Sequence, residues 1–121
     1  MAAPIDQEFF ARLSALNDKF AASVPETLAR LRAQRSAFDI NAPDPACIKE
    51  LHQTLHTIAG SAATFGFRSF GQQARNLEQR LRALMALNSA APLDWQRWLE
   101  SLERYVAWAE LNPKAEKFAD E

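Results

Sequence analysis

The sequence IKELHQTLHTIAGSAATF at residues 48–65 sets the architecture of this chain. Its apolar residues recur at alternating steps of three and four, the spacing of one helix face. They are Ile48, Leu51, Leu55, Ile58, Ala62 and Phe65. At about 100° per residue, His56 points about 130° away from the centre of this stripe. The pattern predicts an amphipathic helix that buries one face and exposes His56.

A glycine inside this helical pattern needs an explanation, because it costs about 1 kcal/mol relative to alanine. Helical side chains lean toward the N-terminus, so a side chain at position 60 is expected to lie over His56. Gly60 would therefore leave the imidazole uncovered. The alternative interpretation is that His56 is an incidental surface histidine. Its small neighbours argue against this, because they leave this side of the helix without large side chains: Ala59, Ser61, Ala62 and Ala63.

The first periodic segment runs from about residue 6 to residue 38 and keeps one apolar phase. The residues on its stripe are Phe9, Leu13, Leu16, Phe20, Val24, Leu28 and Leu31. Pro25 interrupts the segment, and Ser23 with Glu26 offers a capping box for a new helix. The preserved phase instead favours a kink within one long helix.

Turn residues place the remaining helices. Asp44 as a cap before Pro45 predicts the start of the second helix, and Gly66 predicts its end in a left-handed turn. Two further apolar stripes follow at residues 70–84 and 95–109. Because the connections are short, we predict an all-α fold, an antiparallel up-down-up-down four-helix bundle.

Residues 1–121 are expected to form a single domain, with the bundle at about 6–111 and a frayed polar tail after Pro113. The loop before the fourth helix is predicted at residues 88–92. We expect the tryptophans to pack the fourth helix rather than to form a ligand-binding box, the last of them at its edge: Trp95, Trp98 and Trp108.

Composition limits the classes of partner. The 121 residues suffice for a core without metals or disulfides, and the net charge of −1 argues against a nucleic-acid binder. Cys47 is the single cysteine and fits a reducing compartment. The chain shows no secretory signal and no apolar run of about twenty residues. We expect a cytoplasmic protein without a membrane or nucleic-acid partner.

Residue spacing gives little support to enzyme chemistry. His52 and His56 have the i, i+4 spacing of two metal ligands, but the chain contains no third histidine and Cys47 lies off that face, so we expect no metal. Neither Cys47 nor Ser61 has a histidine oriented to activate it as a nucleophile. No phosphate-binding glycine loop is found. The chain is therefore not expected to be an enzyme on its own.

The stretch from about Leu51 to Leu84 resembles a histidine-containing phosphotransfer (HPt) domain. The family pattern is a helical H-x-x-K-G-S/A followed by a second glycine about a turn and a half later. His56, Gly60, Ser61 and Gly66 match it. The resemblance implies the same four-helix bundle with the histidine on the exposed face of the second helix.

The resemblance also implies a function. His56 would accept a phosphoryl group from the aspartyl phosphate of a response-regulator receiver domain and pass it to another. The partners would be receiver domains or a hybrid histidine kinase, the Mg²⁺ would belong to the receiver, and this protein, expected to be a monomer, would need no cofactor. The alternative is a module that docks on a receiver or kinase without carrying phosphate.

One position departs from the family pattern. Ala59 stands where the family usually has a lysine that offsets the charge of the phosphohistidine. Candidate replacement cations within one or two turns are Lys49, His52, Arg68 and Arg75. Glu78 occupies the place where many members carry a polar partner to the histidine, and it would orient the imidazole. Gln79 is the alternative partner if the third helix is slightly rotated.

Overall fold

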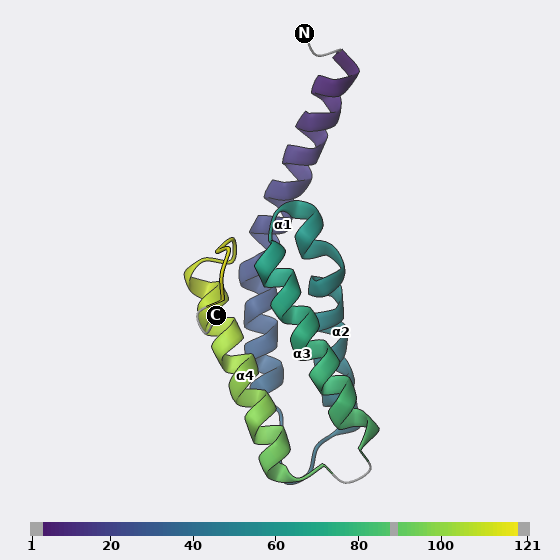
Figure 1. The fold of residues 1–121 in the computed structure, drawn as a ribbon, viewed down its shortest axis with the longest axis vertical. Coiled ribbons are helices and arrows are strands. Elements are labelled where there is room, and N and C mark those ends of the chain that lie inside the picture. The colour runs from purple at the N-terminus through teal and green to yellow at the C-terminus, as the bar shows by residue number, and fades with distance from the viewer. Residues whose placement is uncertain (1–3, 88–89, 119–121) are drawn as a thin grey trace.

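The structure is a computed structural model that describes residues 4–87 and 90–118. Over these ranges it contains four α-helices, one short 3-10 helix and no strand. The elements are α1 Pro4–Ser36, α2 Pro45–Ser61, η1 Ala62–Phe65, α3 Arg68–Ala86 and α4 Pro92–Leu111. Successive α-helices run in opposite directions (Figure 1). The predicted all-α four-helix bundle is confirmed, and no described helix is long and apolar enough to cross a membrane.

Helix α1 runs unbroken through Pro25, so the expectation of one long helix holds. Its stripe enters the core only in the second half, where Val24, Leu28 and Leu31 are buried. Phe9 and Leu16 are 56% and 50% exposed, because the first half of α1 extends past the ends of the other helices (Figure 1). The stripe therefore packs against the other helices only in its second half.

The turns around α2 follow their residue chemistry. The Asp44 side chain accepts a 2.9 Å hydrogen bond from the amide of Ala46, and Pro45 is the first helical residue, as predicted. After Ser61 the chain tightens into the 3-10 turn η1. It then reverses at Gly66, which has φ 89°, the left-handed conformation that favours glycine.

Helices α2 and α3 pack against each other at short range. A Cβ built on Gly71 of α3 would lie only 3.0 Å from the Cβ of Ala62, the residue that caps α2 and begins η1. Below this contact the two helices bury a shared set of apolar side chains. These are Leu51, Leu55 and Ile58 from α2 and Phe70, Ala74, Leu77 and Leu81 from α3.

The aromatic residues of α4 fill the core and use their polar atoms inside it. Trp98 Nε1 donates a 3.0 Å hydrogen bond to the carbonyl of Leu77, and the Tyr105 hydroxyl donates one of 2.8 Å to the carbonyl of Phe70. Burial raises the pKa of Tyr105 well above its ordinary value. Trp95 and Trp108 are also buried. The tryptophans are therefore packing residues, as expected.

The segment after α4 is not frayed, contrary to the expectation. Residues 112–118 fold back over one end of the bundle, where Trp108 Nε1 donates a 3.0 Å hydrogen bond to the carbonyl of Lys117. The Phe118 ring lies 5.2 Å from that of Trp108, and Lys114 Nζ lies 5.1 Å from the centre of the Phe67 ring. Residues 119–121 of the expected tail and 88–89 of the expected loop lie outside the described residues.

Replacing Gly71 with leucine is expected to lower the free energy of unfolding by about 1–3 kcal/mol, as overpacking does, because the new side chain starts 3.0 Å from Ala62. Gly60→Leu is the matched control. It makes the same gain in helix propensity, and a Cβ there meets nothing within 4 Å. Urea denaturation measures both variants, and equal shifts of their midpoints would contradict the close packing of α2 on α3.

Candidate functional site

His56 presents an open imidazole on α2. Its side chain is 64% exposed, while its Nδ1 lies 2.9 Å from Oε1 of Glu78 on α3. An ionised carboxylate only accepts hydrogen bonds, so Nδ1 carries the proton and donates a hydrogen bond to Glu78. The second nitrogen, Nε2, is then left with a free lone pair. The contact thus orients the ring and selects the tautomer with a nucleophilic Nε2.

Antiparallel packing explains why Glu78 reaches His56. The contacts of His56 with Glu78 and of Ala59 with Arg75 step in opposite directions along the two helices. Glu78 neighbours Leu77 on the buried side of α3, and only 9% of its side chain is exposed. Gln79 is exposed. The structure therefore places Glu78, and not Gln79, against the histidine.

His52 shares the same carboxylate. Its Nε2 lies 3.3 Å from Oε1 of Glu78, but the atoms are not aligned for a hydrogen bond, and this buried nitrogen has no other hydrogen-bond partner in the described structure. The rings of His52 and His56 lie nearly parallel, with centroids 6.0 Å apart. This shared contact is not among the sequence expectations, although the i, i+4 spacing of the two histidines was a signal for it.

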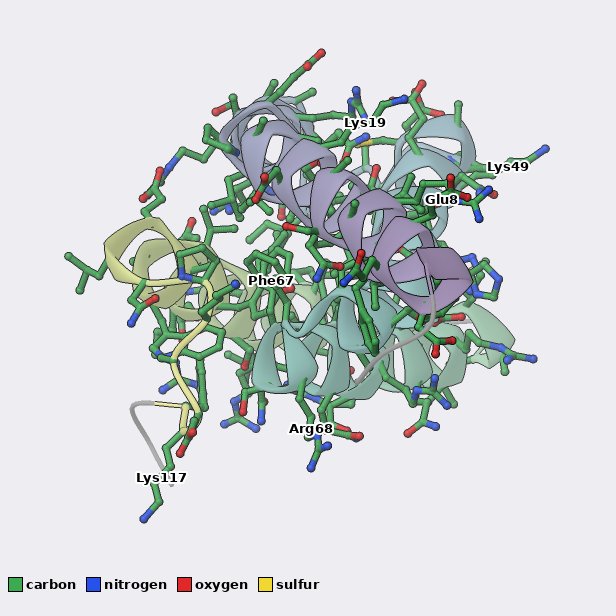
Figure 2. All side chains as sticks on the ribbon, turned by 90° about the horizontal axis from the view of Figure 1, so that it is seen from above. Glu8, Lys19, Lys49, Phe67, Arg68 and Lys117 are labelled. Carbon is green, nitrogen blue, oxygen red and sulfur yellow. The ribbon has the colours of Figure 1, made fainter. Side chains whose placement is uncertain are left out.

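The candidate cations lie in different places. Arg75 Nη2 donates a 3.4 Å hydrogen bond to the carbonyl of Ala59, one turn after His56. Lys49 and Arg68 extend outward on different sides of the molecule (Figure 2). Arg68 lines a hollow of about 550 Å³ beside residues 114–116 of the folded-back segment. Of these three side chains, Arg75 is the one with a described contact in the turn after His56.

The space around Gly60 is open. A Cβ built there meets no atom within 4 Å, so a methyl group would not touch the His56 ring. The expectation that any side chain at position 60 would lie over His56 is therefore wrong, because an alanine there would not reach the ring. Only a longer side chain would fill the space outside the helix. Gly60 leaves that space open.

Other reactive groups lie elsewhere. Cys47 is buried and its thiol donates to the carbonyl of Gln34 at 3.5 Å. Burial raises the pKa of that thiol, which disfavours the thiolate. No group of three or more histidine, cysteine, aspartate or glutamate residues suited to a metal ion occurs within residues 4–87 and 90–118. His56 with Glu78 is therefore the candidate site.

One comparison with known proteins gave a match. A family model described as Hpt domain matches residues 15–108, which include all of α2 and α3 and most of α4. No curated protein and no solved structure showed significant similarity to the chain. Hpt domains are phosphocarrier modules in which a histidine takes part in a phosphorelay. The chain belongs to the Hpt domain family.

Proposed function

We propose that His56 accepts a phosphoryl group from the aspartyl phosphate of a receiver domain and passes it to another receiver. The observation that carries the proposal is the exposed imidazole whose Nδ1 lies 2.9 Å from the buried carboxylate of Glu78. This contact leaves Nε2 as the nucleophilic atom on the open side of the ring.

The transfer step needs no general base on this protein. The Nε2 lone pair of His56 attacks phosphorus, an N–P bond forms, and the P–O bond to the receiver aspartate breaks so that its carboxylate leaves with the electron pair. The Nδ1 proton stays hydrogen-bonded to Glu78, whose negative charge offsets the positive charge that develops on the ring. The reverse step delivers the phosphoryl group to the second receiver.

The helical bundle positions the imidazole of His56, and the partner protein supplies the other catalytic groups. We infer that the Mg²⁺ and the other catalytic groups lie on the receiver, as is usual for the family, and that this protein acts as a carrier and not as an enzyme. The open space at Gly60 and the small side chain of Ala59 let a receiver surface approach the ring. Such a contact is modest in area and transient. A receiver domain or a hybrid histidine kinase is the proposed partner.

Substitution of His56 with glutamine is expected to abolish phosphorylation by a phosphorylated receiver, because glutamine has no nucleophilic nitrogen. His52→Gln, one turn earlier, is the matched control and should keep the acceptor. The measurement follows acid-labile phosphate on the protein after incubation with the donor. Transfer that survives in His56→Gln would refute the assignment, and binding without transfer in the wild type would favour the docking module.

Substitution of Gly60 with leucine is expected to slow transfer from a receiver at least tenfold, because the new side chain fills the space that the partner must occupy. Its effect on small phosphodonors should be much weaker, since these need no protein surface. Comparing the two donors measures the difference. Equal slowing with both donors would show that position 60 acts on the ring and not on docking.

Substitution of Glu78 with leucine is expected to change the tautomer of His56. Long-range ¹H–¹⁵N NMR spectra should show a protonated Nδ1 in the wild type and a shift toward a protonated Nε2 in the variant, because the hydrogen bond that holds the Nδ1 proton is lost. Gln79→Leu alters an exposed neighbour and serves as the control. A wild-type spectrum dominated by protonated Nε2 would contradict the proposed role of Glu78.

A further inference from the structure

We propose that Arg75 supplies, from α3, the positive charge that stabilises phosphorylated His56, and so replaces the lysine that the family usually carries at the position of Ala59. This inference rests on the proposed function of His56. It assigns the phosphoryl group a specific partner side chain, which the family pattern by itself does not provide in this chain.

The electrostatics of the site call for a cation. A phosphoryl group on Nε2 brings up to two negative charges close to the carboxylate of Glu78. The last turn of α2 contains no basic residue. Phosphorylation would therefore be opposed by the Glu78 carboxylate unless a cation comes from another helix.

Arg75 is placed to meet this need. Its Nη2 lies 3.4 Å from the carbonyl of Ala59, in the turn that follows His56, and on α3 it stands about one turn from Glu78. The methyl side chain of Ala59 takes little room, so the guanidinium can lie over this turn. A guanidinium has five N–H donors, and the described carbonyl contact uses one of them. No ion pair occupies the other donors in the described residues, so we infer that they bind phosphoryl oxygens in a two-point contact.

The exposure of Arg75 allows the movement that the proposal requires. A 3.4 Å hydrogen bond to a carbonyl is long and weak. No ion pair of Arg75 is found in the described part of the chain, whereas Arg32 and Arg35 of α1 pair with Glu110 and Glu103 of α4. Exchanging the carbonyl for a phosphoryl oxygen replaces a neutral acceptor with a charged one, which strengthens the bond about twofold.

The other candidate cations fit less well. Lys49 stands two turns before His56 and extends away from the molecule (Figure 2). Arg68 is the first residue of α3 and lies beside the folded-back segment. The buried nitrogen of His52 faces the Glu78 carboxylate. Arg75 is the one of the four whose positive charge contacts the turn between His56 and the end of α2.

The test uses the full chain with phosphoramidate, a small donor that needs no receiver. The N–P bond of the donor breaks, ammonia leaves after taking up a proton, and the N–P bond to His56 forms. ³¹P NMR follows the rate and the final level of phosphohistidine. We expect Arg75→Gln to lower the rate about fivefold at low salt, the size of one exposed charge interaction.

Matched variants separate this role from a loss of folding. Arg80→Gln removes the same charge from the same helix, but Arg80 lines a hollow with Asp94 and Arg97 toward α4, so this variant should behave like the wild type. Arg75→Lys keeps the charge but loses the two-point contact, so its rate should lie between those of Arg75→Gln and the wild type. Adding Ala59→Lys to Arg75→Gln should restore it, because the charge then returns to the family position. The defect should also shrink at high salt, where charges are screened.

The outcomes distinguish the two proposals. If the wild type is phosphorylated on His56 and Arg75→Gln matches it at low salt, the role of Arg75 is refuted while the proposed function stands. Failure of Ala59→Lys to rescue a folded Arg75→Gln would equally refute it. If the wild type is not phosphorylated on His56, as judged against His56→Gln, both proposals are overturned.

Discussion

The close contact between α2 and α3 is the constraint on which the rest of the structure depends. Gly71 lets α3 approach the end of α2 until a Cβ at this position would lie 3.0 Å from that of Ala62. At that separation the side chains of α3 reach across to the exposed edge of α2. The register that results brings Glu78 to His56 and Arg75 to the carbonyl of Ala59. A wider or rotated pairing would lose both contacts together.

The proposed function makes opposite requirements of one small surface. A phosphoryl-accepting imidazole has to be open to a partner, yet its ring has to be held in one orientation and one tautomer. Glu78 is buried and contacts Nδ1, so it holds the orientation and tautomer of the ring. The open space at Gly60 leaves the ring accessible. The same carboxylate would repel a phosphoryl group. A cation at the rim of the site, on the solvent side, therefore complements a carboxylate at its base.

The structure also shows which apolar stripes find a packing partner, which the periodicity of the sequence does not predict. The stripe through Phe9 and Leu16 has the same periodicity as the stripe through Val24 and Leu28, yet only the second pair is buried. Periodicity reports which residues share a helix face, but it does not report whether another helix lies opposite that face. The folded-back segment shows the converse case, since Phe118 finds a partner in Trp108 without any periodic signal.

The amino-acid sequence alone specified the four helices, the Asp44 cap, the Gly66 turn and the exposure of His56, because these depend on local spacing and on the conformational preferences of single residues. The resemblance to the HPt family narrowed the partner of the imidazole to Glu78 or Gln79 and the charge to four candidate cations. Only the tertiary structure placed Glu78 against His56 and Arg75 at the carbonyl of Ala59. The rotation of α3 about its axis and its distance from α2 come from the packing of the whole core, and these two quantities determine which side chain meets His56.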